Sequence, residues 1–410
     1  MKRMSRRDFN RLVAAFGATT VYGVLTKATA AAEPTTYIHL AQRADEQKKG
    51  DAAKAAKARV NLKFGVSGHS PASSEVLRIG IYEFKDDVAK RTNGDVNIEL
   101  FGGNSLCTEL TCIQKCLAGT VHGFNSSTQN AAHTVPFFNG LDFPFMFPDR
   151  ASMYHFFYHP RSEAIFRKPL REKFDVEFLW TTAELRNIYM GSKWRDRPPV
   201  RSPDDIKGAK IRVTGSDLGR IAVGLFGANP VPLDWAETLE GLKSGVVDGQ
   251  ETFSTAAGGF NMGGVTAQEV VVGYFPGTEM TGMDSRVFGK LESKVQDAIR
   301  ESAFMMQEWS QKENEKSLRE KVGVEDPPKP GTLWHKHGVK VNVLTKDERE
   351  QWIRRASPEH NPKPYEVWRE RITKLSGGTD LYVEITKIVK ELPAGTAADA
   401  VKPRKWWAAA

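Results

Sequence analysis

The chain has 410 residues, of which 26% are charged and 40% are hydrophobic, and its formal net charge is +8. Residues 1–30 carry six basic side chains and one acidic one, so a net charge of only +3 is left for the remaining chain. These charges are dispersed, whereas nucleic-acid-binding proteins usually carry a clustered basic stripe. The composition therefore argues against nucleic acid as a partner, and the length is sufficient for two lobes.

The first thirty residues are typical of an export signal rather than of a folded element. Arg6 and Arg7 precede the apolar run 12–25, and residues 28–30 are small, as a signal peptidase requires. This order resembles a twin-arginine signal, and an amphipathic N-terminal helix is the alternative. The apolar run is too short for a membrane span, which needs about 20 residues. We therefore expect export by the twin-arginine machinery to the periplasm, with residues 31–59 as a tether or, over part of their length, a marginal surface helix.

Three cysteines, Cys107, Cys112 and Cys116, fall within ten positions of each other. In an oxidising periplasm one pair of them can form a disulfide and leave a free thiol, but the spacing does not decide which pair. A zinc site is an alternative that lacks a nearby fourth ligand. A catalytic thiol would need a histidine that cannot be assigned. We expect a local disulfide or buried thiols, with no metal and no cofactor.

Strand and helix patterns alternate from residue 60 onward. In chain order we expect a strand at 61–66, a loop at 67–71, a helix at 74–91, a strand at 96–100, a helix at 109–118, a strand at 121–124, a loop at 125–127 and a strand at 176–181. Gly80 lies inside the first of these helices and weakens it. The aromatic stretch 141–147 is interpreted as core. The alternation predicts an α/β fold.

The second half of the chain continues this pattern. We expect a strand ending at 213, a helix at 216–226, a strand at 230–232, a helix from Asp234 to Gly245 and an extended segment at 246–251. Asp234 is a suitable N-cap, and Gly245 is a suitable residue for the helix end. Apolar residues at helical spacing predict a long helix over 291–322, which can brace two lobes.

Four segments carry a family resemblance. They are LDFPFMF at 141–147, IKGAKIRV at 206–213, GANPVPL at 227–233 and LKSGVVDGQE at 242–251. In this order and at this spacing they resemble the DctP-type solute-binding subunit of TRAP transporters, over about residues 60–330. The resemblance implies that a small organic acid is enclosed between two lobes and delivered to a TRAP membrane permease.

The fold implied by the resemblance is the two-lobed periplasmic binding protein fold, of the α/β class, with hinge strands and a long bracing helix. The expected boundaries are 60–183 for the first part of lobe I, 184–283 for lobe II with part of 210–255 crossing between lobes, 284–330 for the long helix and 331–410 for a C-terminal extension.

The resemblance also implies that Arg212, the arginine of the Lys-Ile-Arg-Val strand, pairs with the carboxylate of the ligand. A guanidinium presents a rigid fork of donors that matches the two oxygens of a carboxylate. Arg186 matches a second family arginine, with a salt bridge to Glu184 as the alternative. Trp235 stands where the family usually lines the cleft, although it can also be a core residue.

Further ligand contacts are expected from both lobes, namely from His69, Asn125, Ser127, Gln250, Glu251 and Thr252. The first three lie in loops after strands, where open α/β sheets bind ligands. Thr252 stands where the family commonly has Asn, and its hydroxyl offers one donor where an amide offers two. The polar pattern of the ligand is therefore expected to differ from that of the best-known members.

An enzyme is disfavoured because the sequence has no nucleophile elbow, zinc-protease motif, phosphate loop or dinucleotide fingerprint. The nine histidines are scattered along the chain. Two other classes remain open beside the transport function. One is a periplasmic scaffold, and the other is a binding protein that serves a sensor.

Overall fold

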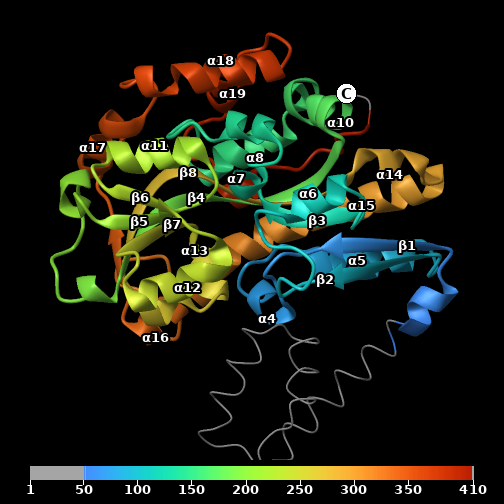
Figure 1. Cartoon of the computed structure of the whole chain (residues 1–410), viewed down its shortest axis with the longest axis horizontal. Helices are drawn as coiled ribbons and strands as arrows, with labels where there is room; N and C mark the ends of the chain where they lie inside the picture. The colour runs from blue at the N-terminus through green and yellow to red at the C-terminus, as the bar shows by residue number, and fades with distance from the viewer. Residues whose placement is uncertain (1–49, 51, 409–410) are drawn as a thin grey trace, which may run out of the picture.

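One mixed β-sheet forms the centre of the molecule (Figure 1). The computed structural model describes residue 50 and residues 52–408. Within this part the strand order is β2-β1-β3-β8-β4-β7-β5-β6, and β9 lies beside β8. The strands are β1 Val60–Gly65, β2 Val96–Phe101, β3 Gly123–Ser127, β4 Val176–Gly191, β5 Lys210–Val213, β6 Asn229–Pro232, β7 Gly249–Thr252, β8 Thr266–Asp284 and β9 Lys340–Val343. The sheet and its surrounding helices confirm the predicted α/β class.

The helices pack around this sheet and are distributed over the whole described chain. They are α4 Pro71–Ser74, α5 Ile81–Arg91, α6 Cys112–Leu117, α7 Thr128–Ala131, α8 Arg150–Tyr158, α9 Pro160–Ser162, α10 Lys168–Phe174, α11 Asp217–Leu225, α12 Trp235–Ser244, α13 Ser254–Gly259, α14 Ser285–Lys290, α15 Ser293–Ser317, α16 Leu333–His337, α17 Lys346–Ala356, α18 Glu366–Leu375 and α19 Leu381–Val389.

The sheet has a group of parallel strands at each end, joined by two long strands. In the first strand group β1 pairs with β2 and β3, and in the second strand group β5 pairs with β6 and β7. Between them β4 and β8, of 16 and 19 residues, run antiparallel to each other. β8 pairs with β3 of the first group, and β4 pairs with β7 of the second. At about 3.3 Å per residue each spans about 50–60 Å. β4 and β8 therefore connect the two ends of the molecule.

The expected lobe boundaries stay a prediction, but the structure shows where the chain crosses between the strand groups. The strands of the segment 210–252 all lie in the second strand group. The crossings are made by β4, and by β8 on its return to the first strand group.

The pairing of β4 with β8 is interrupted by register shifts, one of them between Arg186 and Ile188. Such bulges bend a strand and change the direction of a side chain. This irregularity lies where β4 delivers Arg186 to the region between the strand groups.

Two local expectations in the first half are corrected. The helix expected at 74–91 begins only at Ile81, as α5, because α4 ends at Ser74 and residues 75–80 are not helical. Gly80 adopts a left-handed conformation with φ of 75° and forms the N-cap of α5. A left-handed residue interrupts the helical hydrogen-bond ladder, and glycine adopts it without a steric penalty. The loop expected at 125–127 belongs to β3, which pairs along β8 through Ser127.

The long helix is confirmed as α15, which continues into a π-helical turn, Leu318–Val322. Val295, Ile299, Ala303 and Met306 are buried at helical spacing against the first strand group. The helix ends where Gly323 takes a φ of 84°. It packs along β4 and α5 and so braces one side of the sheet.

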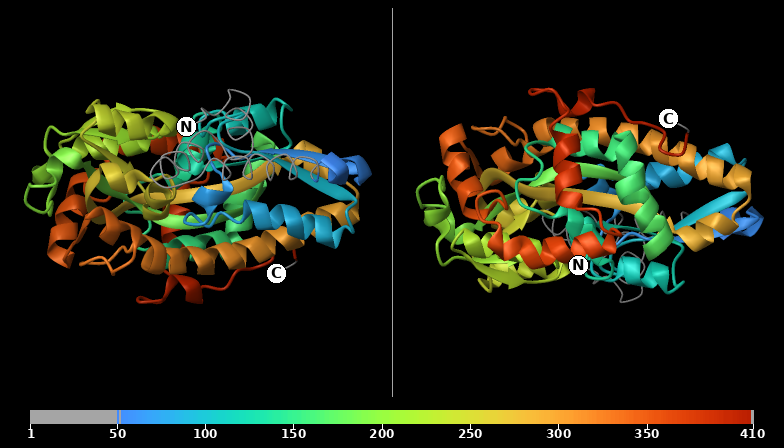
Figure 2. Two further views of the ribbon diagram at one scale, coloured as in Figure 1. Left: turned by 90° about the horizontal axis from the view of Figure 1, so that it is seen from below. Right: turned by 90° about the horizontal axis from the view of Figure 1, so that it is seen from above.

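The C-terminal extension covers the molecule rather than trailing from it. β9 adds to the sheet beside β8, and α18 and α19 pack near the aromatic core around α8. The final segment runs along α15 (Figure 2), where Gln311 Nε2 donates to the Val401 carbonyl at 2.8 Å. Trp406 packs on the Arg167 guanidinium at 4.3 Å from the ring centroid.

A disulfide joins Cys107 and Cys112, and Cys116 is a buried free thiol. This resolves the pairing that the spacing left open. The disulfide packs against β1 at Gly65, where a Cβ atom would lie 2.4 Å from Cys107 Sγ. Only glycine permits this approach.

The described residues contain no helix that is both long and apolar enough to cross a bilayer. The expected twin-arginine signal at 1–30 and most of the expected tether lie outside the described residues.

Candidate functional site

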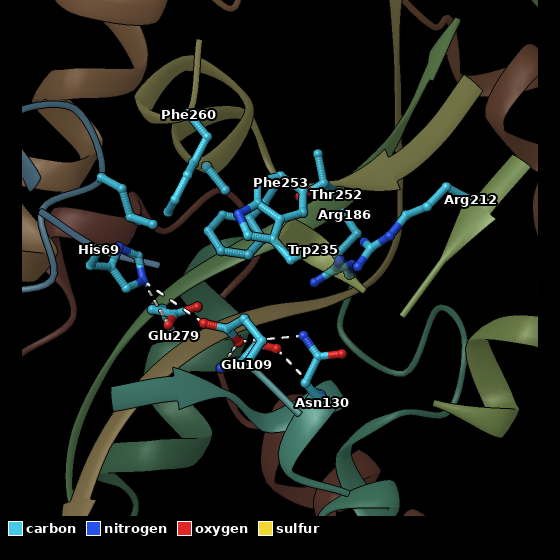
Figure 3. A pocket seen from close by; sticks show the side chains of 13 residues that line it. His69, Glu109, Asn130, Arg186, Arg212, Trp235, Thr252, Phe253, Phe260 and Glu279 are labelled. Carbon is cyan, nitrogen blue, oxygen red and sulfur yellow. Dashed lines mark hydrogen bonds and ion pairs between the residues drawn. The ribbon is translucent and has the colours of Figure 1, made fainter. Parts of the chain in front are cut away.

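A cavity lies between the two strand groups and holds about 300 Å³ of space not filled by protein atoms, including its opening to solvent. Side chains of both groups and of β4 and β8 converge on it (Figure 3). Its lining consists of His69, Leu77, Glu109, Ser127, Asn130, Arg186, Arg212, Trp235, Thr252, Phe253, Ala256, Phe260 and Glu279.

Six of the nine expected site residues line this cavity: His69, Ser127, Arg186, Arg212, Trp235 and Thr252. They come from segments up to 183 positions apart in sequence, from His69 to Thr252. The motif-based expectations therefore converge on one place in the fold.

Arg212 is the buried cation of the cavity, with only 1% of its surface exposed. Its Nε donates to the Leu233 carbonyl at 3.0 Å, which fixes the side chain. Nη1 and Nη2 have no hydrogen-bond partner among the described residues, although Nη1 lies 3.9 Å from Glu251 Oε1. Burial lowers the pKa of the guanidinium to about 10, so it stays charged at neutral pH. Buried charged donors without partners are costly, and an anion in the cavity would satisfy them.

Arg186 is neutralised within the protein. Its Nε donates to Glu251 Oε2, and its guanidinium lies 5.5 Å from the Phe253 ring centroid. Burial lowers the pKa of Arg186, but the charge of Glu251 and its hydrogen bond outweigh this effect and raise it. The alternative partner, Glu184, instead accepts from Thr255 and Asn314. Arg186 thus contributes positive potential to the cavity while its own charge is paired.

Three expected site residues, Asn125, Gln250 and Glu251, do not line the cavity. Glu251 serves instead as the acceptor for Arg186 and for the Thr214 amide. The Asn125 Nδ2 atom donates hydrogen bonds to two groups of β8, the Met280 carbonyl and Thr281 Oγ1. The side chain of Gln250 is buried without a partner among the described residues. Their expected ligand contacts therefore gain no support from the cavity.

An acidic cluster forms the opposite end of the cavity from Arg212 (Figure 3). His69 Nε2 lies 3.1 Å from Glu279 Oε1 and 4.0 Å from Glu109 Oε1. Burial and the nearby Glu109 raise the pKa of Glu279 to about 7. Burial lowers the pKa of His69, but Glu279 and Glu109 outweigh burial, so the net shift is upward.

Sequence reasoning missed Glu109, Asn130 and Glu279. Glu109 stands between two disulfide-bonded cysteines, and Glu279 is an acidic residue within the otherwise uncharged stretch 270–278 and 280–283. A carboxylate within such a stretch is a signal that could have been used, because buried charges are rare unless they serve a purpose.

Aromatic side chains form the walls between the two charged ends. Trp235 packs edge-on against Phe260 at 5.3 Å, and the Arg212 guanidinium lies 5.3 Å from the Trp235 ring centroid. Phe260 also contacts His69 at 5.2 Å. Apolar walls of this kind lower the local dielectric and so strengthen charge interactions beside them.

Two groups in the described part of the chain have donor atoms close enough to hold a metal ion. One is the buried set His69, Glu109 and Glu279, and the other is the more exposed set His155, His159 and Glu391. The expectation that the protein uses no metal therefore stays a prediction.

Comparison with known proteins places the chain among solute-binding proteins. Residues 67–363 match the DctP family, described as bacterial extracellular solute-binding protein, family 7. The 2,3-diketo-L-gulonate-binding periplasmic protein YiaO of Escherichia coli is 31% identical over 188 residues, which cover 45% of this chain and 54% of YiaO. The C4-dicarboxylate-binding protein DctB of Bacillus subtilis is 22% identical over 75% of this chain and 84% of DctB. In several curated relatives, including YiaO, the match spans about half of the relative's length.

Solved structures agree on the fold. A TRAP periplasmic solute-binding protein from Chromohalobacter salexigens, solved with bound D-glucuronate, is 21% identical with a TM-score of 0.67, and the match covers 80% of this chain and 99% of that one. The family match covers well over half of the chain and contains the whole cavity lining. The chain belongs to family 7 of the bacterial extracellular solute-binding proteins, the DctP family.

Proposed function

We propose that the protein is the extracytoplasmic solute-binding subunit of a TRAP-type transporter, which captures a small organic acid and delivers it to a membrane permease. The observation that carries the proposal is the pair of unpartnered Nη groups of Arg212 in the cavity. A carboxylate can accept from both groups at once, as a bidentate ion pair. The ligands named for the relatives, 2,3-diketo-L-gulonate and D-glucuronate, are both carboxylates.

The burial of Arg212 implies that the protein must open to load its ligand. The burial of Arg212, with 1% of its surface exposed, supports a closed arrangement of the two strand groups. Opening would separate the two strand groups by bending β4 and β8, near the bulge between Arg186 and Ile188. A ligand that contacts both groups favours the closed state, because those contacts exist only there.

The same proposal includes the cellular location. A solute-binding subunit works outside the cytoplasm, and the paired Arg6 and Arg7 support export through the twin-arginine machinery to the periplasm. The protein would act by binding alone, without catalysis and without a cofactor.

Titration calorimetry with a panel of small organic acids tests this function. Arg212→Ala should weaken binding by about 2–5 kcal/mol, or roughly 30-fold to several thousand-fold, because a buried charge pair loses one side. The matched control is Arg220→Ala on α11, where the side chain is 53% exposed and pairs with Asp217. A loss of less than about tenfold for Arg212→Ala, or an equal loss for the control, would refute the assignment.

A further inference from the structure

The cavity carries opposite charges at its two ends (Figure 3). Arg212 and Arg186 reach it from β5 and β4, and Glu109 and Glu279 reach it from the turn before α6 and from β8. The free Nη groups of Arg212 direct the ligand's carboxylate to the first end. The remainder of the ligand then lies toward the acidic end.

We propose that the acidic end, formed by His69, Glu109 and Glu279, selects acids whose end remote from the carboxylate donates hydrogen bonds through a hydroxyl or an ammonium group, and that it rejects dicarboxylates. This inference rests on the proposed function, because it takes the arginine end as the carboxylate site.

The acidic end presents acceptors to a ligand. Ionised carboxylates accept hydrogen bonds and donate none. Glu109 is held in place by Ser67 Oγ at 2.6 Å, the Ser127 amide at 2.9 Å and Asn130 Nδ2 at 3.3 Å. Glu279 also lines the cavity, and one of its oxygens is hydrogen-bonded to His69. A ligand group that enters this end therefore meets carboxylate oxygens, each of which has more than one lone pair and can accept a further hydrogen bond.

A second carboxylate on the ligand would bring a further acidic group into contact with Glu109 and Glu279. Acidic groups already disfavour ionisation here, since burial together with the nearby Glu109 raises the pKa of Glu279 to about 7. Like charges in a desolvated site are unfavourable. A terminal hydroxyl avoids this repulsion, and a terminal ammonium replaces it with attraction.

A metal ion is the competing occupant of the same cluster, since the three donor atoms lie within 4.8 Å of one another. Histidines that bind metals usually donate their other ring N–H to an acceptor. His69 Nδ1 is buried and has no partner among the described residues. The geometry therefore favours an organic donor over a metal.

Matched acids that differ only at the remote end test the proposal in calorimetric titrations of the purified protein. The short set is 4-hydroxybutanoate, 4-aminobutanoate and succinate, and a longer set is 6-hydroxyhexanoate, 6-aminohexanoate and adipate. The open-chain sugar-acid pair is gluconate and glucarate. In the set that fits the cavity, a donor-ended acid should bind at least tenfold more tightly than its dicarboxylate. Equal or tighter binding of the dicarboxylate overturns the proposal.

Glu279→Gln tests the residue assignment, because it removes the charge and keeps the shape. It should reduce the discrimination against the dicarboxylate at least fivefold, and it should weaken an ammonium-ended acid more than a hydroxyl-ended one. The matched control is Glu99→Gln on the exposed face of the edge strand β2, which should change nothing. Unchanged discrimination in a folded Glu279→Gln protein overturns the assignment, and the wild-type ranking stands as a test even if this variant fails to fold.

The outcomes separate this inference from the function on which it rests. If no acid binds, the proposed function fails and this inference fails with it. If acids bind through Arg212 but dicarboxylates are preferred, only this inference fails. If binding requires added Ca²⁺ or Zn²⁺ and is lost with a chelator, the cluster is a metal site and the proposal is overturned.

Discussion

Arg212 and Arg186 show how one residue type takes two roles within a single cavity. Arg186 has its own carboxylate, Glu251, whereas Arg212 is anchored by the Leu233 carbonyl and keeps its Nη groups free. A buried ion pair contributes little net stability but is costly to break. We therefore interpret Arg186 as a fixed element of the cavity wall and Arg212 as the group that binds the ligand.

Asp142 should make the free energy of unfolding depend on pH, which can be measured on the protein without ligand. Burial raises the pKa of this carboxyl to about 7, against opposing hydrogen bonds from Ser216 and Gln129. In the unfolded chain the group loses its proton near pH 4. The contribution of Asp142 to the free energy of unfolding is therefore complete below about pH 4 and is lost as the pH rises through about 7.

Urea unfolding at pH 5 and pH 7.5 measures this effect. The free energy of unfolding of wild type minus that of Asp142→Asn should fall by about 2 kcal/mol between the two values. The difference between the proteins isolates Asp142 from other titrating groups, among them Glu279. A difference that stays constant with pH would show that Asp142 is ionised in the folded state.

The two ends of the cavity differ in how far the sequence predicts them. Arg212, Arg186 and Trp235 sit in or near segments whose order and spacing resemble the family, so their convergence could be expected. Glu109 and Glu279 lie outside those segments. Their meeting depends on the long-range pairing of β3 with β8, which local periodicity does not report.

The turn that precedes α6 connects a disulfide to the cavity. Cys107 and Cys112 close a short loop that holds Glu109, and Glu109 in turn accepts hydrogen bonds from Ser67 and the Ser127 amide. Opening the disulfide would give this loop more conformational freedom. The free energy of unfolding should fall, and Glu109 should be held less firmly at the acidic end of the cavity.

Removing the disulfide by replacing Cys107 and Cys112 with serine should lower the free energy of unfolding by about 2 kcal/mol, as loop-closure entropy suggests for a short loop. The affinity for a donor-ended acid should fall in the same variant. Thermal unfolding with and without reductant provides the check. Reductant should lower the unfolding midpoint of wild type and of Cys116→Ala. It should not change the midpoint of the variant with serine at both Cys107 and Cys112. Equal midpoints for oxidised and reduced wild type would contradict the prediction.

The strand β8 shows why part of the fold could not be predicted from the sequence. It is the longest of the described strands, yet it contains Gly273, Pro276 and Gly277, which interrupt the pattern of a strand. It is buried on both faces over nearly its whole length, so it lacks the alternation that indicates a half-exposed strand. The long helix α15 was predictable because its apolar residues recur at helical spacing on one face.

At the scale of the whole molecule, two strand groups are joined by β4 and β8 and braced along one side by α15. The family match ends at residue 363, so α18, α19 and the final segment lie beyond it. These elements pack on α8 and α15 through contacts such as Gln311 with the Val401 carbonyl. The extension therefore covers the outside of the molecule, and the cavity lies where the two strand groups meet.

The central claim is that the cavity binds a small organic acid through Arg212. The most direct test is a crystal structure of the protein with the tightest-binding acid of the panel. We predict a carboxylate within about 3.2 Å of both Nη1 and Nη2 of Arg212, with the rest of the ligand pointing toward Glu109 and Glu279. A ligand bound elsewhere, or a carboxylate placed against another cation while the Nη groups of Arg212 stay unpaired, would contradict the account.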